Sequence, residues 1–512
     1  MVGFLKFSGW WRQGYEFLGF PTKQIVIISK YEKLEITGYT HSWLWKIVKY
    51  IFCILGLGIP FLFLRWYPQY NAYFGLKKCP LDRADTVLVK GLGKDISLSK
   101  VLITAGCEIH GVGNTLRFFN YQLRRIVWYQ DIRQFQLLRG LANDKNTFQN
   151  LLEYSDGLSH EDRQQRLALY SSNIVDVKVH SYWYLFLDEA FNPFYIFEIG
   201  SVIFWIVDSY VFYALFVTIL SLWSIITSLI ETRKQSISLR NATAEGNHED
   251  VTVLKRTADG EETYVVKSKD LVPGDILVIP SYGCLMFCDA LLLSGNCIVN
   301  ESLLTGESVP VTKTPPTFSD DIYEPNALHM RHTLYHGTKV LQTRFYDNNK
   351  VLALVVRTGS ETSKGQLVRS ILYTKSINFD LYEDSLKFLL LMFCIAFFGV
   401  FYSVYLYYQH GAEISALILR SLDIITIVVP PALPAAMASG IVHTQARLKI
   451  KNIFCTSLPS INICGKIKLV CFDKTGTLTE EGVDVYGVIP SAGTKELSED
   501  SLMRDLSSLN SK

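Results

Sequence analysis

An aspartate followed by a cation and two hydroxyl groups stands in the stretch "VCFDKTGTLTEEG", which begins at residue 470. A carboxylate such as Asp473 is a weak nucleophile, but it can accept a phosphoryl group when the phosphate charge is neutralised and the leaving group is held in line. Lys474 supplies the cation, and Thr475 and Thr477 supply the donors. The stretch lacks the G-x-x-x-x-G-K-[ST] pattern of a P-loop, which argues against that class of NTPase. The spacing therefore predicts phosphorylation of Asp473 itself.

The second residue after the aspartate separates two related chemistries. Phosphatases of the haloacid-dehalogenase class carry a second Asp there, which acts as acid and base and clears the phosphoenzyme, whereas this chain has Thr475. An aspartyl phosphate should therefore persist until another base arrives. Glu307 in "TGES" is the candidate, because Thr305 and Gly306 predict an exposed turn that presents a carboxylate to water. A surface turn without function is the alternative for "TGES" alone.

Two kinds of soluble element must position these residues. The run "GKIKLVCFD" has β character and is broken at once by "KTGT". A strand that delivers an acid to its carboxyl end is typical of a parallel α/β sheet, where ligands bind at that edge. Glu307 lies instead in a region of short β-branched runs punctuated by Gly and Pro, such as "EDVTVLKR" and "KVLALVVRTG". This region predicts a compact β-rich domain.

Apolar windows indicate a membrane protein, since a helix of roughly 20 apolar residues spans a bilayer. They cover residues 47–64, 194–207, 210–230, 388–408 and 416–442. Basic residues follow the third and the last window: Arg233, Lys234, Arg240, Arg447, Lys449 and Lys451. Loops rich in Lys and Arg favour the cytosolic side. The last four windows therefore predict two hairpins that enter the membrane and return.

The first window differs from the other four. Lys46 and Lys49 stand at one end and Arg65 at the other, and Gly and Pro interrupt the middle. Cations at both ends favour a re-entrant element over a true span. Residues 65–180 then predict a small cytosolic α+β module.

Three prolines interrupt the last window, in "LDIITIVVPPALPAAMASG": Pro430, Pro431 and Pro434. Each proline inside a helix costs about 3 kcal/mol or more, so the helix should unwind there. Backbone carbonyls near Thr426 and Ile427 then lose their donors. Unpaired backbone at membrane depth is tolerated only where it lines a cavity or is buried in protein, which predicts a cation site.

Asp423 lies about two turns before this break. An acid at the centre of a span costs roughly 2.5–3.5 kcal/mol, so its retention indicates a function in binding. The alternative is an interfacial Asp at the lumenal end of the span. Glu198 is a weaker second candidate, and Asp208 is expected at a hairpin tip.

Composition excludes several other classes. The chain has 49% hydrophobic and 19% charged residues, which predicts a mixed membrane and soluble protein. A formal net charge of +2 gives no reason to expect a nucleic-acid partner. Its 10 cysteines show no metal-ligand spacing and are expected to be reduced thiols. The oligomeric state stays open.

The motifs "TGES", "PPALP" and "DKTGTLT", in this order around two membrane hairpins, resemble those of the P-type transport ATPases. The stretches "LDIITIVVPPALPAAM", "VNESLLTGESVPVTK" and "FNPFYIF" are similar to the B branch of the type-5 subfamily, the polyamine-transporting ATPases of late endosomes and lysosomes. The stretch "LALYSSN" departs from that pattern, because it lacks the Gly-Pro that usually precedes the Asn.

The resemblance implies a fold class: a multi-pass α-helical membrane protein with a cytosolic β-rich actuator domain and the start of an α/β haloacid-dehalogenase-like phosphorylation domain. The expected divisions are 1–180 (N-terminal cytosolic region with a re-entrant segment at about 43–66), 181–232 (first hairpin), 233–383 (actuator), 384–444 (second hairpin with the broken helix), 445–490 (start of the phosphorylation domain) and 491–512 (polar tail).

The resemblance also implies roles for single residues. Asp473 would be phosphorylated from ATP, with Mg²⁺ held by Asp473 and by the backbone carbonyl of Thr475. Lys474, Thr475 and Thr477 would contact the nucleotide, and Glu307 would direct dephosphorylation. Asp423 would bind a polyamine ammonium beside the proline motif, Pro430, Pro431, Ala432 and Pro434. Ala432 stands where other branches carry an acid, which disfavours a bare metal-ion substrate.

Because members of that family are much longer, we expect this chain to be an N-terminal portion without ATPase activity of its own. The expected function is ATP-driven transport of polyamines or related organic cations across an endomembrane, in contact with membrane lipids. Two alternatives remain: a non-catalytic short form that regulates a full-length pump, and an ATPase for inorganic cations. Late endosome, lysosome, early endosome and endoplasmic reticulum are all open as locations.

Overall fold

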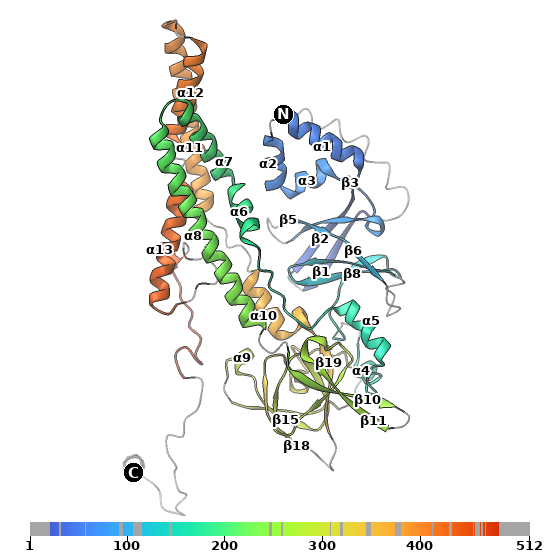
Figure 1. Cartoon of the computed structure of the whole chain (residues 1–512). Coiled ribbons are helices and arrows are strands. Elements are labelled where there is room, and N and C mark those ends of the chain that lie inside the picture. Colours follow the sequence, from blue (N-terminus) through green and yellow to red (C-terminus); the bar gives the residue numbers. More distant parts are fainter. Residues whose placement is uncertain are drawn as a thin grey trace, which may run out of the picture.

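The computed structural model describes residues 21–29, 32–56, 58–91, 96–105, 115–142, 146–244, 248–257, 260–307, 309–317, 321–344, 350–373, 380–411, 413–429, 433–453, 455, 461, 464–465 and 467–480. Long helices form an elongated bundle, with N-terminal sheets beside it and a β-rich part at its lower end (Figure 1). This arrangement matches a protein with both membrane and soluble parts.

The N-terminal part is built from two antiparallel sheets. The first has the order β1-β2-β4-β5, with β3 beside β2, and the second has the order β6-β7-β8-β9. Their strands are β1 (Lys23–Ser29), β2 (Glu32–Thr40), β3 (Lys77–Lys78), β4 (Thr86–Lys90), β5 (Ile96–Lys100), β6 (Leu102–Ala105), β7 (Thr115–Tyr121), β8 (Arg124–Tyr129) and β9 (Gln134–Leu137). Buried apolar side chains such as Leu34, Val87 and Phe119 join the two sheets into one core.

This sheet begins earlier than the sequence prediction of a module at 65–180. Strands β1 and β2 precede the first apolar window, and helices α1 (Trp43–Leu55), α2 (Ile59–Trp66) and α3 (Pro68–Gly75) are inserted before β3. Gly58, with φ of 82°, lies in the turn that separates α1 from α2. The window is therefore a broken helix anchored at both ends by one sheet, which fits a re-entrant element; its depth in a membrane stays a prediction.

Two short helices and a linker join this part to the β-rich part. Helices α4 (Phe148–Leu152) and α5 (His160–Tyr170) each begin at a side chain that accepts a backbone hydrogen bond, Thr147 and Ser159. The Arg163 guanidinium on α5 lies 3.3 Å from the buried carboxylate of Asp275. Burial raises the pKa of Asp275, and the charge of Arg163 opposes that rise. This ion pair ties α5 to the β-rich part.

Asn173 fixes the linker after α5, although the Gly-Pro expected before it is missing. Its amide nitrogen donates to the carbonyls of Ser268 and Phe287 at 2.9 Å each, and its oxygen accepts from the Gly359 N–H at 2.7 Å. The residue is 4% exposed. A fully bonded, buried amide specifies one geometry. Asn173 thus holds the linker against the β-rich part.

Ser171, at the end of α5, has φ of 68° and ψ of 178°. This region of backbone space is almost restricted to glycine and costs a side chain on the order of 1–3 kcal/mol. Replacing Ser171 with Gly should therefore raise stability by about 1 kcal/mol, since glycine also loses more chain entropy on folding. Thermal unfolding of the solubilised chain, followed by tryptophan fluorescence, measures the change. Ser172→Gly is the control, because Ser172 has no positive φ; an equal gain there would contradict the assignment of strain.

The β-rich part holds two further antiparallel sheets, with orders β11-β10-β12-β19-β14-β17 and β13-β18-β15-β16. Their strands are β10 (Asp250–Thr257), β11 (Gly260–Lys267), β12 (Ile276–Ile279), β13 (Cys284–Leu285), β14 (Asp289–Ser294), β15 (Asn296–Asn300), β16 (Val311–Lys313), β17 (Thr333–Leu334), β18 (Lys339–Arg344) and β19 (Val351–Arg357). Helix α9 (Ser302–Thr305) follows β15, and α10 (Ser363–Leu372) follows β19. β19 is buried along almost its whole length, at the centre of the larger sheet.

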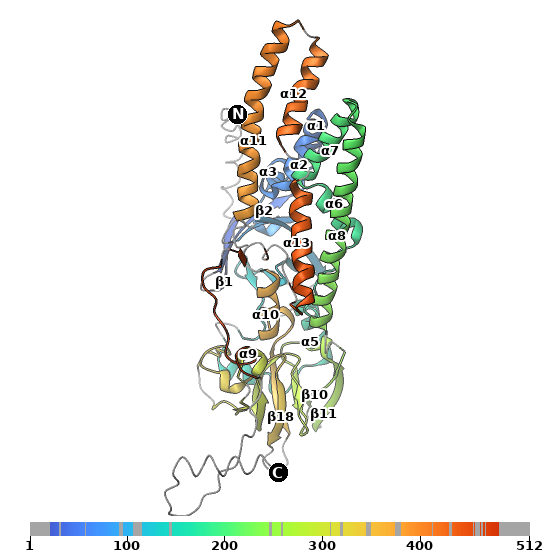
Figure 2. The ribbon, with the colours of Figure 1, turned by 90° about the vertical axis from the view of Figure 1, so that its left-hand side faces the viewer.

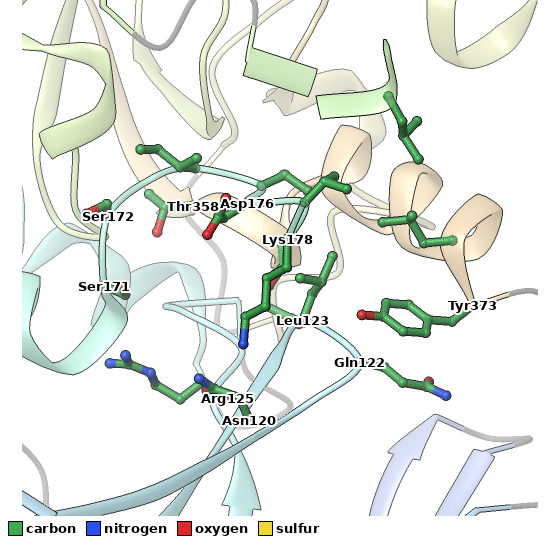
Figure 3. A pocket seen from close by; sticks show the side chains of 18 of the residues that line it. Asn120, Gln122, Leu123, Arg125, Ser171, Ser172, Asp176, Lys178, Thr358 and Tyr373 are labelled. Carbon is green, nitrogen blue, oxygen red and sulfur yellow. The ribbon is translucent and has the colours of Figure 1, made fainter. Parts of the chain in front are cut away.

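A cavity of about 700 Å³ lies where the N-terminal strands, the linker, α8 (Val211–Ala244) and α10 meet. Figure 3 shows the Lys178 side chain extending toward Arg125 and Asn120, with the Tyr373 ring reaching in from the end of α10. Neither of the acids predicted for phosphoryl chemistry, Asp473 and Glu307, lines it. The cavity marks the junction between parts of the fold and is separate from the chemistry expected from the sequence.

The bundle contains the predicted hairpins. Its helices are α6 (Tyr182–Ala190), α7 (Pro193–Val207), α8 (Val211–Ala244), α11 (Asp380–Gln409), α12 (Ile414–Val428) and α13 (Leu433–Ile450). Within the described residues, 211–241 of α8 and 387–409 of α11 are long and apolar enough to cross a membrane. Helices α6 and α7 would pass the same test together, but they are bent by 71°. The window at 416–442 is divided between α12 and α13, as expected for a broken helix.

The strand predicted for "GKIKLVCFD" is not formed in the described residues 467–473. Leu469 and Phe472 are 79% and 66% exposed, and no described strand pairs with this segment. A strand gains its hydrogen bonds only from a neighbour, so local sequence alone cannot hold it. In Figure 2 the described segment 467–480, drawn in dark red, runs down to α9. It thereby reaches the β-rich part without forming a strand.

Candidate active site

The turn that carries Glu307 is built by α9. The Ser302 N–H donates to the Asn300 side chain at 2.9 Å, which starts the helix. Gly306 ends it with φ of 72°, a left-handed conformation that glycine adopts without strain. The Glu307 N–H then donates to the Thr305 hydroxyl at 3.1 Å. Both neighbours thus fix the backbone that presents Glu307, and the exposed turn predicted from the sequence is confirmed.

Asp473 lies at the start of a closed loop. The Lys474 N–H donates to Asp473 Oδ1 at 2.8 Å. The Lys474 carbonyl accepts from the Leu478 and Thr479 N–H groups at 2.9 and 3.0 Å. Gly476 has φ of 72°, which permits the tight turn. Thr475 is half-buried and Thr477 is exposed, so the loop sets their backbone positions beside the carboxylate.

The structure brings the loop of Asp473 to the turn of Glu307. Lys474 Nζ lies 3.6 Å from Glu307 Oε1. A methyl group added at Gly306 would lie 3.7 Å from Asp473 Oδ2, which is ordinary van der Waals contact. The two motifs are separated by more than 160 positions in the chain. Two acids that sequence reasoning assigned to one reaction therefore face the same space, with a lysine between them.

The contact between the two motifs is open to solvent. The side chains of Lys474 and Glu307 are 67% and 60% exposed. Exposed ion pairs contribute roughly 0–1 kcal/mol, so this pair is easily broken. Lys474 and Glu307 are therefore close together without being locked in this pair.

A buried ion pair lies next to the turn that carries Glu307. Lys313 Nζ on β16 lies 2.6 Å from Glu301 Oε1, just before α9, and the two side chains are 2% and 7% exposed. The same ammonium donates to the Met330 carbonyl at 2.7 Å and lies 5.1 Å from the centre of the Tyr335 ring. Sequence reasoning missed this pair, because charge and spacing alone do not reveal that both groups are buried.

Replacing Lys313 with Met should strongly destabilise the β-rich part. Removing one partner of a buried pair leaves an uncompensated charge and costs about 3–5 kcal/mol, which lowers the Tm by on the order of 10 °C. Thermal unfolding measures it. Lys350→Met is the matched control, because the Lys350–Glu261 pair is 45% and 42% exposed and should shift the Tm by little. Equal shifts in the two variants would show that the pair carries no special weight.

The donors around Asp473 fit a magnesium ion. Mg²⁺ prefers oxygen ligands, of which one or two are commonly carboxylates, with waters and substrate phosphates completing the shell. Asp473 offers its carboxylate, and the adjacent loop offers the Thr475 carbonyl. Groups of three or more His, Cys, Asp or Glu that would form a complete protein cage are absent from the described residues. The site therefore suits a metal that arrives with a phosphorylated substrate.

The second predicted site lies on α12, in the helical bundle (Figure 1). Asp423 is on α12, with its side chain 13% exposed. The Thr426 hydroxyl accepts from the Trp205 indole N–H at 3.2 Å, which joins α12 to α7. Pro430, Pro431 and Ala432 lie outside the described residues, and Pro434 is in the first turn of α13. The structure therefore places Asp423 but leaves the proline motif as a prediction.

The two weaker acidic candidates also have defined places. Glu198 on α7 is 3% exposed and accepts a hydrogen bond from the Ser221 hydroxyl of α8. Asp208 follows α7 at the turn into α8, which is the hairpin tip expected from the sequence. Sequence reasoning missed Arg420, whose guanidinium lies near both Asp208 and Asp423. Its spacing of three from Asp423 on a helix was the available signal.

Comparison with known families agrees with this geometry. Three family models match: the P-type ATPase actuator domain at residues 247–372, the P5-type ATPase cation transporter at 30–113, and the cation transporter/ATPase N-terminus at 142–205. The actuator match contains β10 to β19 and the turn of Glu307. The match at 30–113 contains strands β2 to β5 and the helices α1 to α3 inserted between them.

Known proteins with similar sequences are named as polyamine-transporting ATPases. The chain is 40% identical to polyamine-transporting ATPase 13A3 of Macaca fascicularis over 91% of this chain and 41% of that protein. It is 48% identical to its counterpart in Mus musculus over 73% of this chain and 31% of that protein. It is 36% identical to polyamine-transporting ATPase 13A2 of Homo sapiens over 94% of this chain and 44% of that protein. The chain thus spans less than half the length of these relatives.

The β-rich part, with its acidic turn, matches the actuator domain of the P-type ATPases. The family matches and the similar proteins place the chain within this family in the P5-type group.

Proposed function

We propose that the protein containing this chain transports polyamines or related organic cations across an endomembrane, driven by ATP through an aspartyl phosphate. The observation that carries this proposal is the meeting of the two loops, with Lys474 Nζ 3.6 Å from Glu307 Oε1. In that geometry Asp473 can accept the phosphoryl group, and Glu307 is close enough to act as the base when the aspartyl phosphate is hydrolysed. The names of the similar proteins support polyamines as the substrate class.

Four residues perform the chemistry at Asp473. One carboxylate oxygen of Asp473 attacks the γ-phosphorus of ATP, a P–O bond forms, and the bond to ADP breaks. Lys474 neutralises charge on the transferred phosphoryl group, and Thr475 and Thr477 orient it by hydrogen bonds. Asp473 and the Thr475 carbonyl would hold Mg²⁺, which would further neutralise the phosphate oxygens.

Glu307 completes the cycle. Its carboxylate accepts a proton from a water molecule, which attacks the phosphorus of the aspartyl phosphate and releases inorganic phosphate and free Asp473. A separate domain that carries the base can delay this step until it docks. The actuator fold, with Glu307 on a rigid turn, therefore links phosphate release to the position of the whole β-rich part.

The helical bundle supplies the path for the cation. We take α6 to α8 and α11 to α13 as two membrane hairpins with their basic ends in the cytosol, and α1 to α3 as an element that enters one leaflet. Proline has no N–H, so the carbonyls of Thr426 and Ile427 cannot pair with positions 430 and 431 in a helix. These carbonyls and Asp423 are suited to ammonium groups. The late endosome and the lysosome are the proposed locations, within the broader endomembrane class.

Transport by vesicles that contain the full-length protein tests this function. ATP should drive uptake of radiolabelled spermine into vesicles, and Asp423→Asn should reduce it by at least about 10-fold, as expected for loss of a desolvated charge pair. Calcium and potassium should not be taken up. ATP-driven uptake of an inorganic cation, with spermine excluded, would contradict the proposal.

A further inference from the structure

A guanidinium bridges two carboxylates from different hairpins of the bundle. Arg420 Nη1 on α12 lies 3.4 Å from Asp423 Oδ2 and 3.8 Å from Asp208 Oδ2. Asp208 stands at the turn between α7 and α8, and the Tyr210 side chain in the same turn is hydrogen-bonded to Arg420. Two acids and a phenol thus surround one cation that belongs to the protein.

The bridge is loose compared with a structural ion pair. Charge-assisted N–H to carboxylate bonds usually measure about 2.7–2.9 Å, and both contacts of Arg420 are longer. Asp208 Oδ2 is buried without a hydrogen bond among the described residues. The Arg420 side chain is 48% exposed, whereas the two acids are 19% and 13% exposed. The guanidinium is therefore more exposed to solvent than the two acids, and neither of its contacts with them is short.

The two hairpins are also joined by contacts that do not involve Arg420. The Trp205 indole N–H donates to Thr426 at 3.2 Å, and both residues are buried. Trp205 also packs in an edge contact with Tyr213, at 4.6 Å between ring centres. These interactions already join α7, α8 and α12, so the fold does not require the guanidinium as a clamp. The position of Arg420 is explained instead by its contacts with the two carboxylates.

We propose that Arg420 is a tethered cation that occupies the carboxylates of Asp208 and Asp423 until a polyamine displaces it. This inference rests on the proposed function, in which Asp423 binds an ammonium group of the substrate. A guanidinium stays protonated at any physiological pH, so a change of pH does not release it. A chain with several ammonium groups can neutralise both acids once Arg420 has left, whereas a single ammonium group can neutralise one.

The competition sets both affinity and selectivity. The site accepts substrate only in the fraction of molecules from which Arg420 has withdrawn, and the apparent affinity is reduced by that fraction. An amine with one charge neutralises only one of the two acids. Its binding therefore does not compensate for removing the guanidinium from both. Arg420 therefore disfavours small cations and selects for polyvalent ones.

Equilibrium binding of labelled spermine to the full-length protein in lipid nanodiscs, without ATP, tests this role. Arg420→Gln and Arg420→Met should bind spermine about 3- to 10-fold more tightly than the wild type, because no guanidinium then occupies the two acids in any of the molecules. Both should also gain measurable binding of butylamine. Arg420→Lys keeps a tethered cation and should stay within about 2-fold of the wild type. Arg65→Gln is the control, because the Arg65–Asp188 pair, at 3.1 Å, lies at another place in the fold.

Each outcome decides the matter. Weaker or unchanged spermine binding in both Arg420→Gln and Arg420→Met would overturn the tethered-cation role, and so would a large fall of the Tm in both, which would identify Arg420 as a clamp. Asp423→Asn separates this failure from failure of the proposed function. If Asp423→Asn leaves spermine binding unchanged, Asp423 is not the substrate acid, and the function fails with it. If Asp423→Asn weakens binding while the Arg420 variants do not strengthen it, only the inference fails.

Discussion

Replacing Asp473 with Asn in the full-length protein should abolish formation of a phosphoenzyme from labelled ATP. An amide has no anionic oxygen to attack the γ-phosphorus, and the neighbouring Lys474, Thr475 and Thr477 stabilise charge but cannot replace the nucleophile. Label in the acid-precipitated protein should fall to background. Glu480→Gln is the matched control, because Glu480 is an exposed acid a few positions later. Label that persists in Asp473→Asn would mean that another residue is phosphorylated.

The phosphoenzyme of Glu307→Gln should form and then persist. The glutamine side chain keeps the shape of Glu307 on its turn, but it cannot accept the proton of the attacking water. General base catalysis contributes about 10²- to 10⁴-fold, so the breakdown rate should fall by that factor. A chase with unlabelled ATP, followed by acid quenching at intervals, measures the decay of label.

The position of Glu307 makes this experiment specific. Glu262→Gln is a suitable control, since Glu262 is an exposed acid on β11 of the same β-rich part. It should leave the decay rate unchanged. Normal decay in Glu307→Gln would show that the contact with Lys474, at 3.6 Å, has no part in hydrolysis. The base would then have to come from elsewhere.

Local sequence predicted the elements whose signal is local. Hydropathy located α8 and α11, because apolar length alone decides whether a helix can cross a membrane. The exposed turn at Glu307 followed from Thr305 and Gly306, and the broken window at 416–442 followed from its prolines. In each case the residues that dictate the structure lie within a few positions of it.

Features that depend on distant partners could not be read in this way. Strand β2 pairs with β4 across the inserted helices α1 to α3, and β1 pairs with β2, so the place of β1 and β2 in this sheet depends on residues far along the chain. The segment 467–473 has strand-like residues but no described partner, and it forms neither a strand nor a helix. Local preference is a weak guide where pairing decides.

The same limit applied to the candidate sites. Asp473 and Glu307 were found from their motifs, but their common location came only from the fold. Three further residues depend on partners that the fold brings to them. Lys313 pairs with Glu301 on the other side of the turn, and Asn173 donates to the carbonyls of Ser268 and Phe287. Arg420 lies near Asp208 on the other hairpin. A sequence shows such residues as single charges or amides without showing what they meet.

Chemical identification of the phosphorylated residue tests the central claim most directly. The full-length protein is phosphorylated with ATP, treated with borohydride, which reduces an acyl phosphate to an alcohol, and digested for mass spectrometry. The peptide containing "CFDKTGTLT" should carry homoserine in place of Asp473, and treatment without ATP should leave Asp473 intact. Recovery of unmodified Asp473 from labelled protein, with phosphate on a serine, a threonine or another aspartate, would contradict the account.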